Sequence, residues 1–510
     1  MKILTNEQLR EAIRRTAEAG GLRELDMIEH SAEAIAAEIA QRWRPNVRLV
    51  VFAGWGNNGA DALETARLLA AQGYRPEIYL FNIKNMITPE CRACRDRILQ
   101  SPDTVTLYEI DGSENFSWPE LDSNCLIVDG LFGSGLTKSL PVSFQLLVSN
   151  INNSGAPVVS IDIPSGMFGE WNNGNSLSHM VHATLTLALG APRLAFLIAD
   201  NAPALGEWKV LNIGLDAKVL AEIPYIYYLV QRGTVRQVIK PRKEFCSKAD
   251  FGTALLIAGS EGMMGAAVMA VEGALRAGAG KVVAHVPQCG VNVLQVSEPC
   301  AMVDADSNQR CISQMPPDNK RYTAVAVGPG IGTHDLTVGA LGQFLRARTA
   351  SNAPVILDAD ALNCIAARSN LIEHLPVLSV LTPHDGEFDR LFGTQKSHEA
   401  RLRKALDVAA FYNVIIVLKG RYTAIVRPDG RIFFNTSGSP AMATGGSGDV
   451  LTGVICGFMA QGYKPEIAAF ISCFIHGVAG EMAAIEQGEF GTTAMDIAAN
   501  IGKAIASVCE

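Results

Sequence analysis

The sequence predicts an α/β protein built from two three-layer α/β/α domains. The chain has 510 residues, more than one ordinary domain holds. Short apolar segments that end in Gly, Asp or Ser alternate with helical stretches, and this alternation occurs twice along the chain. Strands that alternate with helices are typical of a parallel sheet covered on both faces. The 47 glycines suit the many tight turns of such a fold.

The first series occupies residues 1–224, where we expect the first domain. It opens with one or two amphipathic helices over residues 6–42. The expected strands and the clearest intervening helix then follow, at 47–54, 61–73 (helix), 125–135, 156–166 and 183–190. Ligands of such sheets bind beyond the carboxyl ends of the strands, which is where the polar residues and glycines of this half cluster.

The pattern loosens over residues 215–250, which are basic and irregular. We expect a domain boundary near residue 225, a connecting segment up to about residue 250, and a second domain within 225–510. The alternation resumes with expected strands at 253–260, 280–287, 323–332, 354–363, 378–388 and 413–426. A helical C-terminal third follows.

Composition narrows the function class. The chain is 48% hydrophobic and 18% charged, with a net charge of −8, which argues against nucleic acid or an anionic membrane as partner. No uninterrupted apolar stretch approaches the roughly 18 residues of a membrane span, so we expect a cytoplasmic protein. The 11 cysteines include one CxxC pair, Cys91 and Cys94, without a second pair to complete a zinc site.

Polar loops follow three strands of the first half. The loop 55–61 lies between a strand and a helix but lacks the GxGxxG spacing of a dinucleotide site. An Asx-rich turn is the alternative interpretation of that loop. Asn58, Asp129 and Ser165 offer oxygens that a hard cation accepts, and Asp162 is a candidate acid or base.

Together with the ILTNEQLR opening, these loops resemble the YjeF N-terminal domain, the NAD(P)H-hydrate epimerase family with a Rossmann-like fold. The resemblance implies that Asn58, Asp129 and Ser165 bind potassium and that Asp162 is catalytic. It also implies the following substrate contacts: Asn57, Asn58, Gly59, Ala60, Asp61, Gly133, Ser134, Gly135, Leu136, Thr137, Lys138, Ser139 and Asp162. The chain reads NNGADA where the family usually has NNGGDG, and we expect the Ala60 methyl group to narrow the substrate loop.

The glycine-rich stretch 436–462 is the most informative part of the second half. Gly445, Gly446 and Gly448 let the backbone approach a ligand, and the first amides of the following apolar helix form an anion site suited to phosphate. Asp449 stands where it can take a proton from a hydroxyl beside that phosphate. An ordinary N-terminal helix cap is the alternative.

Four further segments of this half carry glycines or charges at strand ends. Residues 256–267 and 327–332 are glycine-rich, 382–387 hold an imidazole and two carboxylates, and 419–423 supply cations and a hydroxyl for a nucleotide phosphate. A structural histidine and a solvated lysine are the alternatives for single members of this set.

With the motifs GPGIG, DADALN, TPHDGEF, LKG and MATGGSGDVLTG, this half resembles the NAD(P)H-hydrate dehydratase family, which has a ribokinase-like fold. The resemblance implies that Ala266, Gly330, His384 and Asp449 contact the hydrate and that Asp449 is catalytic. The implied nucleotide contacts are Lys419, Gly420, Arg421, Tyr422, Thr423, Gly446, Ser447 and Gly448. Ser247 replaces the histidine of the family's HKGxxG opening.

The two resemblances together imply a bifunctional repair enzyme for hydrated NADH and NADPH. One domain epimerises (R)- and (S)-NAD(P)HX with K⁺, and the other dehydrates the (S) form to NAD(P)H, using ADP and Mg²⁺ and giving AMP and phosphate. We expect NADHX, NADPHX and ADP as its partners, and a homo-oligomer. The alternatives are a ribokinase-like small-molecule kinase with a non-catalytic N-terminal binding module, or a repair enzyme whose first half is catalytically silent.

Overall fold

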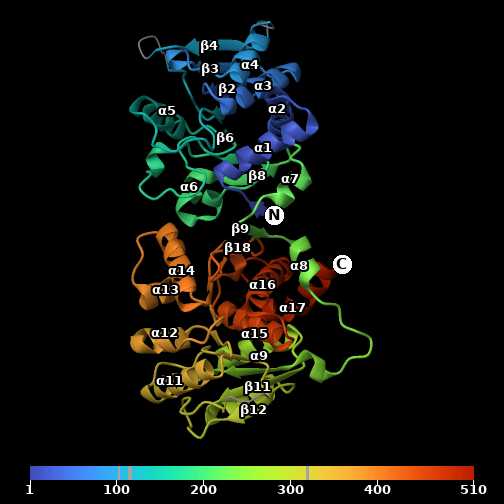
Figure 1. Ribbon diagram of the computed structural model, residues 1–510, viewed down its shortest axis with the longest axis vertical. Helices are drawn as coiled ribbons and strands as arrows, with labels where there is room; N and C mark the ends of the chain where they lie inside the picture. Colours follow the sequence, from blue (N-terminus) through green and yellow to red (C-terminus); the bar gives the residue numbers. More distant parts are fainter. Residues whose placement is uncertain (101–103, 113–117, 318–320) are drawn as a thin grey trace. The chain divides into compact units, whose positions relative to one another are not determined.

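The computed structural model describes residues 1–100, 104–112, 118–317 and 321–510 (Figure 1). Its contacts divide the chain into two compact units: Lys2–Tyr225, and Ile226–Glu510 together with Met1. Each unit has its own sheet flanked by helices, so the predicted α/β class is confirmed.

The first unit is built on a fully parallel sheet in the order β4-β3-β2-β5-β6-β7-β8. Its strands and helices are β1 (Lys2–Ile3), α1 (Asn6–Gly20), α2 (Glu24–Arg42), β2 (Arg48–Ala53), α3 (Asn57–Ala71), β3 (Pro76–Phe81), α4 (Pro89–Leu99), β4 (Thr106–Ile110), β5 (Cys125–Gly130), α5 (Val142–Asn153), β6 (Val158–Ile161), β7 (Leu185–Leu189), α6 (Ala202–Leu205), β8 (Glu207–Leu211) and α7 (Ala217–Glu222). The strand order reverses direction between β2 and β5, and a crevice for a ligand opens at such a switch point.

The period-2 pattern of the strands separates two cores in this unit. Val51 of β2 faces a core with α2, α3 and α4, whereas Val50 and Phe52 face a core with α5. Cys91 and Cys94 of α4 are buried in the first of these cores, and burial raises the pKa of each thiol to about 12. They are structural thiols, as their isolation in the sequence suggested.

The second unit holds a mixed sheet in the order β9-β18-β17-β16-β15-β14-β13-β10-β11-β12. The strands from β16 to β12 are parallel, and β17 pairs antiparallel with both of its neighbours. The elements are β9 (Tyr227–Val230), α8 (Arg232–Val238), β10 (Thr253–Ile257), α9 (Met264–Arg276), β11 (Lys281–Val286), α10 (Val291–Ser297), β12 (Met302–Ala305), β13 (Ala324–Val327), α11 (Asp335–Ala350), β14 (Ile356–Leu357), α12 (Asp360–Ala367), β15 (Val380–Leu381), α13 (Asp385–Phe392), α14 (His398–Tyr412), β16 (Ile415–Leu418), β17 (Ala424–Val426), β18 (Ile432–Asn435), α15 (Ser447–Ala460), α16 (Pro465–Gln487) and α17 (Ala494–Cys509).

Helices cover both faces of this sheet. The helices α9, α15, α16 and α17 pack on one face, and α11, α12, α13 and α14 stack along one side of the unit in Figure 1. α9 and α15 approach closely because a Cβ at Gly453 would lie 1.9 Å from the Ala270 carbonyl oxygen, and one at Gly273 would lie 2.4 Å from that of Val450.

The segment that the sequence suggested as a connection up to residue 250 is part of the second unit. β9 pairs in parallel with β18, from Tyr227↔Ile432 to Val230↔Asn435, and Val235 of α8 is fully buried in the core. The predicted connection was wrong for β9 and α8 only, because β9 finds its partner about 205 residues further along the chain. No local pattern marks such a pairing.

One helix of the described residues, α16, is long and apolar enough to cross a membrane by length and composition. Its most apolar window has a mean hydropathy of 1.6 and is 72% buried inside the unit, as in the core helix of a globular domain.

Candidate functional site

The switch point of the first unit is shaped by glycines that no other residue could replace. A Cβ at Gly59, at the start of α3, would lie 1.9 Å from the Gly54 carbonyl oxygen. One at Gly54 would lie equally close, 1.9 Å, to the oxygen of Leu131, which follows β5. The loops after β2 and β5 are therefore in backbone contact, and Asn57 and Asn58 begin α3 beside them.

The two alanines that replace the family's glycines are fully buried. Ala60 and Ala62 each expose 0% of their surface and belong to the core between α3 and the sheet. A Cβ at Gly130 would lie 2.4 Å from that of Ala62, so the methyl group fills the space beside β5. The expected narrowing of the substrate loop by Ala60 is wrong, because its methyl group faces the core.

Asp129, near the end of β5, is completely buried and accepts four hydrogen bonds from neutral donors. The Ser165 hydroxyl and amide reach its carboxylate at 2.5 and 2.9 Å, the Ser160 hydroxyl at 2.8 Å and the Leu131 amide at 3.3 Å. Burial raises the pKa of Asp129, although the bonds from Ser165 and Ser160 oppose that rise. The structure thus brings two of the three predicted cation ligands into direct contact.

Asp162 follows β6 with a positive φ of 65°, a backbone conformation that aspartate adopts more readily than most residues. Its Oδ1 forms an ion pair with the fully buried guanidinium of Arg193, and its Oδ2 accepts a hydrogen bond of 3.0 Å from the Ser134 amide. Asp162 and Asn58 converge on Gly133, where an added Cβ would lie 3.1 Å from Asp162 Oδ2 and 3.2 Å from Asn58 Cγ.

Two further polar groups in this cluster have unusual surroundings. The Asn58 Nδ2 is buried and has no hydrogen-bond partner within the described part of the chain. Burial, helped by the neighbouring Asp162 charge, raises the pKa of Asp61 well above its ordinary value. The rest of the predicted loop is more open: Leu136 is half-buried, and Gly135, Thr137, Lys138 and Ser139 are exposed.

In the second unit, Gly446 caps α15 with a φ of 91°, in the left-handed region that glycine tolerates. A Cβ there would lie 2.1 Å from the sulfur of Met269 on α9. The amides of Ser447, Gly448 and Asp449 begin the helix, at the place where the sequence predicted an anion site. The Ser447 hydroxyl lies 3.5 Å from Nε2 of His476, a buried imidazole whose pKa burial lowers to about 4.

Lys419, directly after β16, is the cation of this site. Its Nζ lies 3.0 Å from Asp358 Oδ1 and 3.7 Å from Glu387 Oε2, and a Cβ at Gly448 would lie 3.4 Å from it. Burial alone would lower the pKa of Lys419, but the charges of Asp358 and Glu387 raise it. Asp358 is 1% exposed and also accepts a hydrogen bond of 2.7 Å from the Thr452 hydroxyl of α15.

Asp449, in the first turn of α15, has a pKa that its surroundings shift strongly. Burial, and then the neighbouring charge of Asp358, raises the pKa of Asp449 to about 7, although Lys419 opposes the rise. A carboxyl group that titrates near neutral pH can accept a proton and release it again at little cost.

The other predicted hydrate contacts lie on neighbouring strand ends. Gly330 lies against α9, since a Cβ there would be 2.9 Å from that of Ala266. The Ser260 hydroxyl donates a hydrogen bond of 2.8 Å to the Gly330 carbonyl. His384 caps α13 through Nδ1, which accepts hydrogen bonds from the amides of Gly386 at 3.0 Å and Glu387 at 3.3 Å.

The predicted nucleotide loop turns between β16 and β17. The Thr423 hydroxyl donates to the Gly420 carbonyl at 3.0 Å, and the exposed Arg421 reaches the Gly438 carbonyl at 3.2 Å while its guanidinium lies over the Tyr422 ring. The loop joins β16 to β17, and Arg421 connects it to Gly438 in the segment that leads from β18 to the glycine turn.

A cavity of about 1030 Å³ lies elsewhere in the second unit and contains none of the predicted site residues. It is lined by Arg236, Lys240, Arg242, Lys243 and Arg276 and by the C-terminal ends of α9, α15 and α17. Arg242 donates a hydrogen bond of 2.7 Å to the Gly278 carbonyl after α9, so these cations balance helix C-termini. The candidate site is the glycine turn, where Asp449 lies near the ion pair of Lys419 and Asp358.

Sequence reasoning missed two residues of these sites. Arg193 was not singled out, although an arginine in the apolar run GAPRLAFL is an available signal. Asp358 lay within the quoted DADALN motif but received no role. Within the described residues, no group of three or more His, Cys, Asp or Glu is arranged to hold a metal ion.

Comparison with known proteins agrees with both halves. The model of the YjeF-related protein N-terminus matches residues 24–195, and that of the NAD(P)H-hydrate dehydratase matches residues 254–503. The ADP/ATP-dependent NAD(P)H-hydrate dehydratase of Bacillus subtilis, a solved structure, is 29% identical, covers 55% of this chain and 98% of its own, and has a TM-score of 0.47.

Relatives extend over the whole chain. The bifunctional NAD(P)H-hydrate repair enzyme Nnr of Thermofilum pendens is 31% identical over 100% of this chain and 97% of its own length. That of Moorella thermoacetica is 32% identical over 94% and 90%, and that of Escherichia coli is 30% identical over 96% and 91%. The chain therefore belongs to the family of bifunctional NAD(P)H-hydrate repair enzymes, with an epimerase domain followed by a dehydratase domain.

Proposed function

We propose that the second unit dehydrates (S)-NAD(P)HX at the glycine turn of α15, with ADP as the phosphoryl donor and Asp449 as the general base. The carboxyl group of Asp449, with its pKa of about 7, is the observation that carries this proposal. Asp449 takes the proton of the C6 hydroxyl as that oxygen attacks the terminal phosphorus of ADP, and AMP leaves. The ring then expels the phosphate ester as inorganic phosphate, loses a proton from the neighbouring carbon and regains its double bond.

The surrounding residues support the phosphoryl transfer. The amides at the start of α15 donate to the oxygens of the transferred group, where negative charge develops. Lys419, held between Asp358 and Glu387, supplies a fixed positive charge beside Gly448. Asp360, whose carboxylate accepts a hydrogen bond of 2.9 Å from the Gly332 amide, would be available to a nucleotide-bound Mg²⁺, which would neutralise phosphate charge.

The first unit is proposed to epimerise the hydrate at the crevice between β2 and β5. C6 of the hydrate carries a hydroxyl group and is bonded to the ring nitrogen. Breaking and remaking one bond at C6 therefore inverts the configuration of that carbon, provided that an enzyme group donates and accepts a proton. Asp162, fixed by Arg193 and the Ser134 amide, is the acid–base group. Asn57, Asn58 and the loop from Gly133 hold the substrate around it.

Potassium fits the residues predicted to bind it. Asp129 is a buried carboxylate that accepts hydrogen bonds from neutral donors, so a bound cation would balance its charge. Asn58, Asp129 and Ser165 would hold the ion, whose charge offsets that of Asp129 and orders the loops that receive the substrate phosphates. We expect Asp129→Ala to lower epimerisation at least tenfold and to leave dehydration unchanged.

The test of the whole proposal uses purified protein with mixed NADHX epimers and ADP or ATP. Restored absorbance of the reduced ring and one phosphate released per NADH are expected. A stable phosphorylated product without NADH would identify a kinase instead. Consumption of both epimers faster than spontaneous epimerisation assigns activity to the first unit, and its absence would show that half to be silent.

We also propose that the protein acts in the cytoplasm as a homo-oligomer without nucleic acid or membrane partners. The net charge of −8 and the small-molecule substrates of the family support this. Sedimentation of the full chain and cell fractionation test it.

A further inference from the structure

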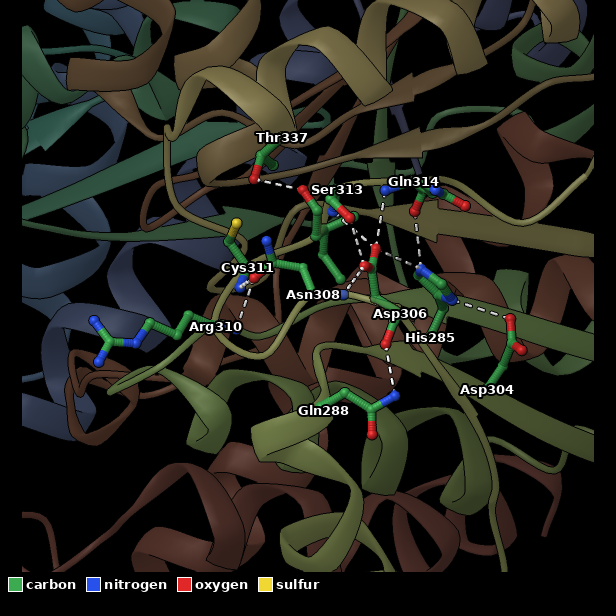
Figure 2. Close-up of polar contacts among 11 residues, drawn as sticks. His285, Gln288, Asp304, Asp306, Asn308, Arg310, Cys311, Ser313, Gln314 and Thr337 are labelled. Carbon is green, nitrogen blue, oxygen red and sulfur yellow. Dashed lines mark hydrogen bonds and ion pairs between the residues drawn. The ribbon is translucent and has the colours of Figure 1, made fainter.

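A buried polar cluster at the end of β12 has no place in the function described so far (Figure 2). Its centre is Asp306, which is 2% exposed. The carboxylate accepts hydrogen bonds from the amides of Asn308 at 2.7 Å, Ser313 at 2.7 Å and Gln314 at 2.9 Å, and from the Ser313 hydroxyl at 2.6 Å. Burial opposes its ionisation, but these bonds hold the pKa of Asp306 below its ordinary value. The loop 306–314 therefore curls around the Asp306 carboxylate, which accepts its hydrogen bonds.

His285 of β11 lies beside Asp306, on the right of the cluster in Figure 2. Its Nε2 lies 3.0 Å from the Gln314 carbonyl oxygen and 3.6 Å from Asp306 Oδ2, and its Nδ1 lies 3.0 Å from Asp304 Oδ2. The imidazole is buried and so fixes the far end of the loop to the sheet.

The same loop is attached at two more places. The amides of Gln288 and Cys289 donate to the carbonyls of Asn308 and Gln309, both at 3.0 Å. The Thr337 hydroxyl of α11 donates to the Ile312 carbonyl at 2.8 Å. Such a loop has one conformation as long as its central acceptor stays charged and in place.

The tip of this loop supports the hydrate side of the dehydratase site. The Glu261 amide donates to the Arg310 carbonyl at 2.8 Å, and the two side chains pair at 3.2 Å. Glu261 lies in the turn 259–263, whose Ser260 hydroxyl bonds the Gly330 carbonyl. The Met263 carbonyl oxygen would lie 2.7 Å from a Cβ at Gly330, so the turn is in close contact with that glycine. The turn is therefore clamped between loop 306–314 and the Gly330 loop.

We propose that Asp306 is a positioning residue of the dehydratase site, which sets the turn 259–263 and with it the hydrate-binding surface at Ala266 and Gly330. This inference rests on the proposed function of the second unit. It assigns to the loop 306–314 the recognition of the hydrate and not of the nucleotide, because its contacts lead to Gly330 and not to Lys419 or Gly448.

The first test is Asp306→Asn in the full chain. The new amide group presents N–H toward backbone N–H donors, so the loop loses acceptors without a change of volume. We expect KM for the hydrate to rise about tenfold, KM for ADP to stay within about twofold, and epimerisation by the same chain to be unchanged. Thr337→Val removes only the anchor on α11 and is expected to raise KM for the hydrate about threefold.

Thr323→Val is the control, because the Thr323 hydroxyl makes its hydrogen bonds at the opposite ends of the strands, with the amide and carbonyl of Thr253 and the carbonyl of Ala460. If the substitutions only lowered the stability of the unit, the KM for the hydrate would change equally in all three variants. The proposal would be overturned if the control and the two loop variants had equal KM values for the hydrate. It would also be overturned if the KM for the hydrate and the KM for ADP rose together in the loop variants. Thr337→Val decides the matter if Asp306→Asn does not fold.

A second readout does not depend on turnover. Because the Glu261 amide bonds the Arg310 carbonyl, its hydrogen exchange is expected to be at least tenfold faster in Asp306→Asn than in Thr323→Val. Unchanged exchange would reject the positioning role. A parent chain that does not dehydrate NADHX would reject the proposed function, while the exchange measurement would still test the loop.

Discussion

Both units gather buried carboxylates beside glycines, but they balance the charge of the candidate catalytic carboxylate differently. In the first unit, Asp162 pairs directly with the fully buried Arg193. In the second, Lys419 pairs with Asp358, and burial raises the pKa of Asp449 to about 7. Arg193 therefore orients Asp162 for its proposed acid–base role, whereas burial and the charge of Asp358 let Asp449 exchange a proton near neutral pH.

The largest expected effect concerns Asp449. Asp449→Asn keeps the shape of the helix start but removes the base, so dehydration should fall by about 10²–10⁴-fold while ADP binding and epimerisation persist. The absorbance of the reduced ring measures dehydration, and calorimetry measures ADP binding. Turnover within a few-fold of the parent would end the assignment of Asp449 as base.

Arg193→Met breaks the direct pair of the first unit. It leaves the Asp162 carboxylate without its buried cation, and the loss of one partner of such a pair costs about 3–5 kcal/mol. We expect epimerisation to fall by about 100-fold and the first unit to unfold at lower denaturant concentration, with dehydration unaffected. Arg193→Lys is the control that keeps the charge. An Arg193→Met chain with normal epimerisation would show that Asp162 acts without this partner.

Separating the units tests whether each site is complete by itself. A fragment that starts at Ile226 retains β9 and should fold and dehydrate only one epimer. A fragment that starts at Val235 lacks β9, leaves β18 paired on one edge only, and should be less stable by about 2–4 kcal/mol in urea titrations. Dehydration of both epimers at similar rates by the longer fragment, after subtraction of spontaneous epimerisation, would contradict the division of labour.

The pH dependence of dehydration should report the unpaired carboxyl group. Asp449 must be unprotonated to act as base, and its pKa is about 7. The kcat/KM of dehydration should therefore rise about tenfold per pH unit below pH 7 and level off above it. A profile that is flat between pH 5.5 and pH 8 would assign the proton to another group.

The smallest expected effect is on stability. The pKa of Asp449 is raised from 3.8 in the unfolded chain to about 7 in the fold, so the folded state binds the extra proton between these values. The stability linked to this group is present below about pH 4 and is lost as the pH rises through 7. Asp449→Asn should thus raise the free energy of unfolding by about 1–3 kcal/mol at pH 8 and change it little at pH 4. Equal effects at both pH values would mean that charge is not the cause.

The sequence predicted the α/β class and the elements that carry local signals. The glycine turn before Asp449 and the pair Asp129 and Ser165 were recognisable because turn chemistry is written in neighbouring residues. The partners of the catalytic groups were not. Arg193 lies 31 residues from Asp162, and Lys419 lies 61 residues from Asp358, so only the assembled sheets bring them together. β9 was missed for the same reason, because it pairs with β18 about 205 residues further along the chain.

The close approach of α9 and α15 has a consequence for how the dehydratase can respond to its substrates. A Cβ at Gly453 would overlap the backbone of α9, and one at Gly446 would overlap Met269, so the helix that bears Asp449 is seated backbone against backbone. Rocking of its N-terminus would require the two helices to separate through the core. This helix is a fixed reference point, and any adjustment to the substrates during the reaction cycle falls to the loops that surround it.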